Sequence, residues 1–448
     1  MQMCQVKVYQ ATLEAVGELL GYKYNRLSCH STVDNICKRR LAVSHKQLES
    51  MVEDDNLTLY MDETSKHGQK YMVYGVTGPS QVPHVLGLKL IPSKSAKDTL
   101  NTLEETLTEI GTTIHNPNYG EEFVVKLQNT MSDRAATEVK FNSLLEGYKV
   151  KVIEELEHKL GCLSEEQKGK MLEINHFFCG LHLLVSLAET FSTALKAYEK
   201  ENKELGCVGA LNVKECAGFV KSTEAAPIRY VRTAAQLFAR GADEKSGCFS
   251  QFNVYLQQQN EANLLVPFRH NRFNIIFHDG AAVYHLNSHI TNFLEKVHGT
   301  TNSLMKAVLA DSCELYCVAG ARVLGSLCMF ITSPLWRIIE DKSLHIGDMG
   351  PIYTELVDFL KCCASSKGAA ASLLCGENLP DIISSYVKRD HVANHLVLPD
   401  PTDELATDIL KYVCVKLADK LSSLVSDHLP EGKHHNMSNE ERGKTGPQ

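Results

Sequence analysis

The chain has 448 residues, of which 44% are hydrophobic and 22% charged, a balance that is ordinary for a folded globular protein. Its formal net charge of −8 argues against indiscriminate nucleic-acid binding by the whole surface, whereas a local basic patch could still contact phosphates. Fifteen cysteines are irregularly spaced, and the opening residues lack an apolar signal segment. This pattern indicates free thiols in a reducing, intracellular compartment.

Strand-like and helix-like patterns alternate through residues 56–199, after a helical segment at 1–55. Apolar runs at 57–60, 71–76 and 85–91 predict three strands joined by short hairpin connections. Then follow a helix at 95–110, a strand at 122–127, a long polar helix ending near Leu160, and a fifth strand leading into a helix within 172–191. This order puts the first and fourth strands side by side in a mixed sheet, so we predict an α/β core.

Helical patterning dominates residues 200–430, with a main exception at 260–280. The longest apolar stretch of the chain, at 315–336, contains Arg322 and is interrupted by Pro334. We therefore interpret it as a buried helix and not as a membrane span. The polar tail at 431–448 lacks core residues and is predicted to be disordered.

Two aspartates stand where strands are predicted to end. Asp62 closes the first strand, and Asp133 follows the fourth at the mouth of the next helix. If these strands are neighbours, the two carboxylates emerge at the same edge of the sheet and repel each other unless a divalent cation such as Mg²⁺ or Mn²⁺ neutralises them. Such a pair is the usual protein contribution to two-metal phosphoryl transfer. Two simpler interpretations stay open, in which Asp62 starts a turn and Asp133 caps a helix.

Three stretches in this order, LYMDETSKHGQKY, LQNTMSDRAATEVKFN and INHFFCGLHLLVSLAE, resemble the core of ribonuclease H-like cut-and-paste transposases of the hAT-like kind. The resemblance implies a ribonuclease H-like core at 56–199, with Asp62 and Asp133 as metal ligands and Cys179 and His182 as the C-x-x-H pair of that family. It also implies a mostly helical insertion at 200–430 and metal-dependent cleavage and strand transfer at DNA phosphodiesters.

The sequence departs from that family in two ways. The family has a third acid, a glutamate that follows the insertion. In this chain Glu314, Glu340 and Glu404 all lie in stretches whose helical periodicity matches the predicted insertion itself. Before the first strand, the chain also lacks the paired cysteines and histidines of a zinc-binding DNA module. We therefore expect a chain truncated at both ends, with the ancestral chemistry lost or incomplete. The alternative is a non-catalytic intracellular protein that retains the fold for binding DNA or another protein.

Other groups have both a functional and a structural interpretation. Cys179 and His182 could supply half of a zinc site, but we expect them to pack and to brace the aspartate pair. His285 and His289, four residues apart beside His278 and Asp279, have zinc-ligand spacing. With nineteen histidines in the chain, however, such pairs arise readily by chance.

Basic residues cluster in three places, which could line a path for DNA or could be ordinary solvated helix faces. They are Lys38, Arg39 and Arg40; Arg229 and Arg232; and Arg269, His270 and Arg272. The only tryptophan, Trp336, could stack on a base, but its apolar surroundings favour a core position. DNA and a second copy of the chain are the candidate partners, no membrane is expected, and the resemblance favours a nuclear location.

Overall fold

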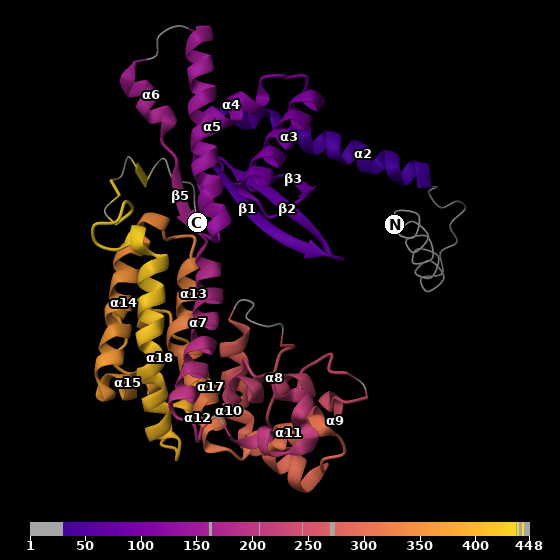
Figure 1. Ribbon diagram of the computed structural model, residues 1–448, viewed down its shortest axis with the longest axis vertical. Helices are drawn as coiled ribbons and strands as arrows, with labels where there is room; N and C mark the ends of the chain where they lie inside the picture. The colour runs from indigo at the N-terminus through magenta and orange to yellow at the C-terminus, as the bar shows by residue number, and fades with distance from the viewer. Residues whose placement is uncertain are drawn as a thin grey trace. The chain divides into compact units, whose positions relative to one another are not determined.

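The computed structural model describes residues 30–160, 164–205, 207–243, 245–268, 274–435, 437–438 and 441–442. These residues form two compact units with a boundary between Phe177 and Phe178. We call the first the sheet unit and the second the helical unit, and each is described by itself (Figure 1).

The sheet unit is built on a five-stranded mixed sheet with the order β3-β2-β1-β4-β5. The strands are β1 Leu57–Lys66, β2 Gln69–Thr77, β3 His84–Leu90, β4 Leu127–Ser132 and β5 Asn175–Phe178. β1 pairs antiparallel with β2 and parallel with β4, and β2 pairs antiparallel with β3. The predicted α/β class is confirmed, and the first and fourth strands are neighbours, although the fourth strand lies at Leu127–Ser132 and not at the predicted 122–127.

Helices α3, α4 and α5 pack on the buried face of this sheet. The helices of the unit are α2 His30–Gln47, α3 Ala96–Ile114, α4 Tyr119–Lys126, α5 Ala136–Leu160 and α6 Glu165–Leu172, with a 3₁₀ turn, η1, at Glu49–Glu53. Alternate residues of the strands, such as Leu59 and Tyr74, join Leu103, Phe123 and Phe141 of the helices in one core, as the period of two in a half-buried strand requires. Ser95 caps α3 by accepting a hydrogen bond from the Asp98 N–H.

Two sequence predictions about the strands are wrong. The strand predicted at 122–127 is mostly helix α4, whose Phe123 and Val124 are buried in the core, because a short apolar run alone does not distinguish helix from strand. The real fourth strand, β4, is largely polar. Asp62 also does not close β1, because β1 continues to Lys66 in register with β2.

Polar side chains specify the pairing of β4 in place of apolar ones. Asn129 and Thr130 are fully buried. Asn175 of β5 donates a hydrogen bond to Asn129 at 3.3 Å, and the Thr130 hydroxyl lies 2.6 Å from Nδ1 of His176. Buried polar groups are tolerated in a core when they form hydrogen bonds in this way. Because these buried residues are polar, β4 lacks the apolar alternation by which a strand is predicted from sequence.

The helical unit contains the rest of the described chain, and its described residues form no strand beyond the end of β5. Its α-helices are α7 Gly180–Glu201, α8 Ala226–Phe238, α9 Phe249–Gln258, α10 Ile275–Asn292, α11 Ser303–Ser312, α12 Leu315–Leu327, α13 Ser333–Ile339, α14 Met349–Ser365, α15 Lys367–Leu374, α16 Asp381–Ser385, α17 His391–Leu396 and α18 Asp403–Leu424. Short 3₁₀ or π turns lie at Gly209–Asn212, Lys214–Phe219, Phe293–Val297, Cys328–Thr332, Ile346–Asp348 and Ser426–His428. Figure 1 shows α14, α15 and α18 running side by side, and α18 also packs on α7. The prediction of a mostly helical region is confirmed.

The long apolar stretch lies inside this unit. Leu315–Ile339 is the one helical stretch of the described chain long and apolar enough to cross a membrane, but 83% of its most apolar window is buried. Arg322 is buried within it and donates hydrogen bonds to the carbonyl oxygens of Leu396 and Leu398 and to Asp403. The interpretation as a buried helix is confirmed. Trp336 packs against the same core.

The described part of the C-terminal tail packs on the helical unit. His434 and Met437 are buried, and the Arg442 guanidinium pairs with Asp348. The Nδ1 atom of His435 lies 2.8 Å from the carbonyl oxygen of His428. These contacts differ from the predicted disorder, because histidine and methionine supply buried groups that a search for aliphatic core residues passes over.

Candidate functional site

The strand register brings Asp62 and Asp133 to the same level of the neighbouring strands β1 and β4. Tyr60 of β1 lies opposite Met131 of β4 in a parallel pair. Asp62 and Asp133 each lie two residues beyond this pair, and Asp133 directly follows the last residue of β4. Both side chains are exposed. The register places these two positions at the same level of neighbouring strands, and the meeting of their carboxylates stays a prediction.

Glu63 and Glu138 add charge to this edge. The pKa of Glu138, near the start of α5, is raised to about 7 by burial and by the negative charges of Asp133, Glu63 and Asp62. One of its oxygens, Oε2, is buried and has no hydrogen-bond partner. Glu63 forms an ion pair with Lys94. We call Asp62, Glu63, Asp133 and Glu138 the carboxylate edge; like charges gathered in this way are stabilised by a cation.

The carboxylate edge suits a hard cation that keeps part of its water shell. Mg²⁺ takes oxygen ligands and is commonly held by one or two carboxylates with waters completing its shell. Asp62 and Asp133 are exposed and could serve as such ligands. Asp133 also accepts a hydrogen bond from the Ala135 N–H at 2.9 Å, just before α5 begins at Ala136, so it supports the turn into the helix, close to the predicted capping role, alongside the metal-binding interpretation.

The third acid predicted by the family pattern is not assigned to any of the three glutamates weighed for it. Glu314 accepts a hydrogen bond from the Gly209 N–H at 3.1 Å. Glu404 lies 3.6 Å from Lys367, and Glu340 ends α13. All three belong to the helical unit. Glu138 is the acid that sequence reasoning missed, because nothing in its local pattern separates it from other glutamates on a polar helix.

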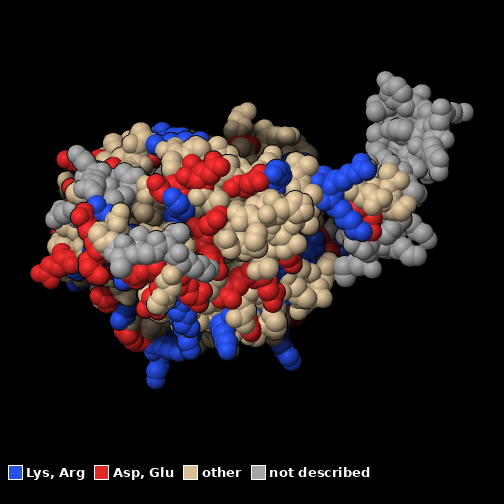
Figure 2. Space-filling view, turned by 90° about the horizontal axis from the view of Figure 1, so that it is seen from above, with Lys and Arg blue, Asp and Glu red and all other residues tan. Residues whose placement is uncertain are grey.

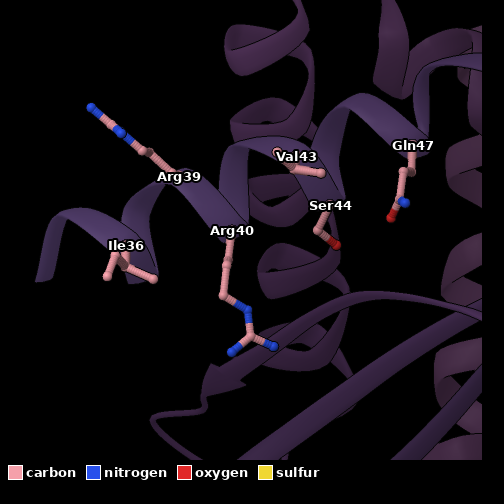
Figure 3. A pocket seen from close by; sticks show the side chains of 6 residues that line it. All are labelled: Ile36, Arg39, Arg40, Val43, Ser44 and Gln47. Atoms are coloured by element: carbon pink, nitrogen blue, oxygen red, sulfur yellow. The ribbon is translucent and has the colours of Figure 1, made fainter. Parts of the chain in front are cut away.

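A basic cluster lies on the exposed part of helix α2. Lys38, Arg39 and Arg40 are exposed, and no ion pair with a carboxylate involves them among the described residues. Figure 2 shows basic side chains gathered on this helix. Arg39 and Arg40 line a shallow groove with Ile36, Val43, Ser44 and Gln47, and they point to different sides of the helix (Figure 3).

Of the other two basic clusters, one is excluded as a DNA-binding surface. Arg229 and Arg232 are buried, and each guanidinium binds a carboxylate through two hydrogen bonds, Arg229 to Asp311 and Arg232 to Glu224. These arginines stabilise the helical unit and have no free face for phosphate. Arg269, His270 and Arg272 lie outside the described residues.

Cys179 and His182 form a local pair at the start of α7. The His182 N–H donates to the carbonyl oxygen of Cys179 at 3.0 Å. Burial acts to raise the pKa of the Cys179 thiol, but hydrogen bonds from His182 outweigh it and the pKa is lowered. This agrees with the predicted hydrogen bonding of the pair, while its predicted bracing of the aspartates stays a prediction.

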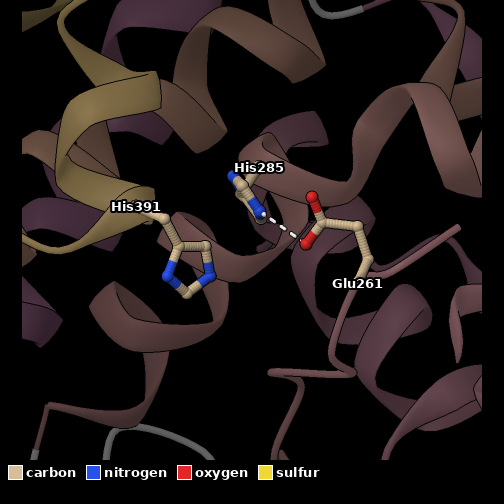
Figure 4. Close-up of side chains that lie close together, drawn as sticks. All are labelled: Glu261, His285 and His391. Carbon is tan, nitrogen blue, oxygen red and sulfur yellow. Dashed lines mark hydrogen bonds and ion pairs between the residues drawn. The ribbon is translucent and has the colours of Figure 1, made fainter.

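The histidine pair predicted from spacing is replaced by a different cluster. His285 of α10 faces Glu261 and His391, and the ligand atoms of these three residues lie within 4.8 Å of one another (Figure 4). His289 instead packs its ring against Tyr255. His278 is 47% exposed beside the buried Asp279. Glu261 and His391 were missed because they come from segments far from His285 in the sequence.

No protein-family model and no curated protein matches this sequence.

Proposed function

We propose that this chain is a transposase-derived, DNA-binding protein whose sheet unit is a ribonuclease H-like core with a Mg²⁺ or Mn²⁺ site. The observation that supports it most is the register of β1 and β4, which carries Asp62 and Asp133 to one edge. The strand order β3-β2-β1-β4-β5 is that of the family the sequence resembles. On this proposal, the helical unit corresponds to the family's insertion and the protein acts in the nucleus.

The ancestral chemistry is metal-dependent cleavage and strand transfer at a DNA phosphodiester. A bound metal ion there would stabilise charge on the attacking and leaving oxygens of the phosphate. The residues of this chain that would hold it are Asp62 and Asp133. Because the third acid of the family has no counterpart assigned, we propose that metal binding is retained and that cleavage is lost.

A metal titration of the full chain tests the site. Millimolar Mg²⁺ or Mn²⁺ is expected to raise the thermal unfolding temperature of the wild type, because the ion binds the folded edge and not the unfolded chain. Asp62→Asn or Asp133→Asn should abolish the rise. Asp419→Asn, an exposed aspartate of α18, is the matched control and should keep it. A wild type that does not respond to either metal would exclude the proposed site.

A nicking assay on supercoiled plasmid DNA then separates the two versions of the function. Retained binding of metal without nicking supports the non-catalytic version. Metal-dependent nicking that Asp62→Asn removes would show that the ancestral chemistry survives, and would make Glu138→Gln the next variant to test as a third acid.

Helix α2 is the surface that favours DNA binding. Each lysine or arginine that neutralises a phosphate contributes about −0.9 to the slope of log binding constant against log salt concentration. Replacing Lys38, Arg39 and Arg40 together by alanine is expected to weaken binding to any duplex and to reduce that slope by about 3. Lys46→Ala on the same helix, whose lysine pairs with Glu49, is the control. An unchanged slope in the triple variant would exclude α2 as the DNA contact.

A further inference from the structure

The helical unit contains a second cluster of metal-ligating side chains, chemically different from the carboxylate edge. Glu261 lies just after α9, His285 in the middle of α10, and His391 is the first residue of α17. The three side chains point toward one another (Figure 4), and their ligand atoms lie within 4.8 Å of one another. No other group of three His, Cys, Asp or Glu among the described residues meets so closely.

One separation within this cluster has the length expected for two ligands of a shared ion. Nε2 of His285 and Oε2 of Glu261 are 3.4 Å apart, beyond the usual range of about 2.7–3.2 Å for a hydrogen bond from nitrogen to oxygen. A tetrahedral zinc ion with bonds of about 2.1 Å sets its ligand atoms about 3.4 Å apart. The distance between the imidazole and the carboxylate therefore matches that of two ligands on one ion, and without an ion the two groups make a long polar contact.

Two of the ligand positions are held by rigid local structure. The Glu261 N–H donates to the carbonyl oxygen of Leu256 at 2.9 Å, which closes the turn after α9. The Asp390 side chain caps α17 by accepting from the Ala393 N–H at 2.9 Å, and this fixes the helix start that carries His391. His285 is 8% exposed within α10. Preorganised ligands of this kind lose little freedom when a metal binds.

A third histidine orients the central ligand. Nδ1 of His285 lies 2.9 Å from Nδ1 of His395, one turn after His391 on α17. When His285 donates its Nδ1–H to His395, the lone pair of Nε2 is free and faces Glu261 and His391. Metal-binding histidines almost always donate their second ring N–H to an acceptor, usually a carboxylate, carbonyl or water, which fixes the tautomer; here the ring nitrogen of His395 takes that place.

We propose that Glu261, His285 and His391 bind one Zn²⁺ ion, with His395 as the positioning residue behind His285. Two imidazoles and one carboxylate suit zinc and exclude Mg²⁺ and Ca²⁺, which require oxygen ligands. His391 is exposed, so the ion has a path from solvent and an open fourth position for water. The ion joins the segment after α9, helix α10 and helix α17. The site is independent of the function proposed for the sheet unit.

The test uses the full chain, stripped with a chelator, dialysed under reducing conditions and titrated with Zn²⁺ alone. Wild-type protein is expected to take up one more equivalent of zinc than His391→Ala, and zinc at a hundred times its dissociation constant should raise the unfolding temperature by about 5 °C. Glu261→Gln and His391→Ala should lower the affinity of this site more than 100-fold. His395→Gln should lower it about 10- to 100-fold, as removal of a histidine's orienting partner does.

A control variant on helix α10 and a comparison with the Mg²⁺ response show whether zinc binds at this cluster. His289→Gln removes a histidine one turn along the same helix and should bind zinc as the wild type does. Since Glu261 and His391 are not part of the apolar core, their variants are expected to fold, which circular dichroism checks directly. Zinc uptake that is equal in the wild type, Glu261→Gln and His391→Ala would overturn the proposal, because the zinc would then be bound by thiols or other groups. Asp62→Asn should remove the Mg²⁺ response and leave this zinc site unchanged, so the two proposals fail separately.

Discussion

Two buried or half-buried acids, Asp311 of the helical unit and Glu138 of the sheet unit, have opposite surroundings. In the helical unit, Asp311 is fully buried and meets the Arg229 guanidinium at 2.9 and 2.7 Å. It also accepts from the Ala210 N–H at 2.8 Å. In the sheet unit, Glu138 is partly buried among Asp62, Glu63 and Asp133, and its Oε2 has no partner. The negative charge of Asp311 is balanced by an arginine of the same unit. Glu138 instead lies among other carboxylates, so it adds to a local excess of negative charge.

This difference separates a structural role from a binding role. A buried carboxylate whose charge is balanced by an arginine does not bind a cationic ligand, so its role is to stabilise the fold. A group of carboxylates without enough cations costs stability until something positive arrives. Perturbed acids of this kind are candidates for functional sites. The following predictions test the contrast, from the largest expected effect to the smallest.

Breaking the Arg229–Asp311 pair is expected to have the largest effect. Arg229→Met should lower the free energy of unfolding of the helical unit by about 3–5 kcal/mol, because Asp311 is left buried without a partner. Fluorescence of Trp336, the only tryptophan, follows the unfolding of this unit selectively. The double variant Arg229→Met with Asp311→Leu should recover most of the loss, since an apolar pair can replace a buried ion pair. A single variant as stable as the wild type would contradict the structural role.

Lys149 tests whether the sheet unit tolerates a buried charge of the opposite sign. It is fully buried in α5, and it donates hydrogen bonds to the carbonyl oxygens of Leu127 and Glu173. Burial lowers its pKa from 10.5 to about 7. Between these two values the unfolded chain binds more protons than the folded one, so the stability of the sheet unit should rise with pH, by about 1 kcal/mol per pH unit.

Hydrogen exchange of β4 amides, corrected for intrinsic rates, measures this rise. Lys149→Met should flatten the dependence between pH 7 and pH 10, whatever its effect on absolute stability. Lys151→Met, an exposed lysine on the same helix, is the control and should keep the slope of the wild type. A wild type whose β4 protection does not change over this range would show that Lys149 does not titrate there.

Glu138 should give a smaller effect of the opposite sign. Its folded pKa of about 7 lies above the ordinary value of 4.5, so the folded state binds more protons between these values and stability should fall as pH rises from 4.5 to 7. Glu138→Gln is expected to stabilise the sheet unit at pH 7.5 by about 1–2 kcal/mol, after allowance for solvent screening. Exchange of β1 amides measures it, with Glu154→Gln on the same helix as the control. A variant less stable than the wild type would mean that Glu138 has a partner in solution.

Local pattern predicted those parts of the fold that are defined by apolar periodicity. The sequence predicts the strands that contain Leu57, Tyr71 and Val85 and the helix around Leu103, because their side chains alternate or repeat with the period of the element. The sequence places β4 too early in the chain, because Leu127 is the only apolar residue among its buried positions and Asn129 and Thr130 are satisfied by partners in β5 and α5. Their burial depends on the tertiary fold and leaves no apolar signal.

The candidate sites follow the same rule. Asp62 and Asp133 could be selected from the sequence because each follows a strand-like run. The predicted pairing of those strands then placed the two residues near each other. His285 could be selected only with the wrong partner, since its contacts with Glu261 and His391 depend on how three separate segments pack. The buried positions of Arg229 and Arg232 were equally hidden, because a basic pair on a helix looks the same in sequence whether it faces solvent or a carboxylate.

The polar pairing of β4 also decides where the chain can be divided for study. A fragment that stops after α5 would contain Asn129 and Thr130 without the Asn175 and His176 that satisfy them. It would expose the edge of β4, and exposed strand edges pair with other molecules. We therefore expect a fragment of the sheet unit to need β5 for β4 to stay paired, although every residue of the carboxylate edge precedes the end of α5.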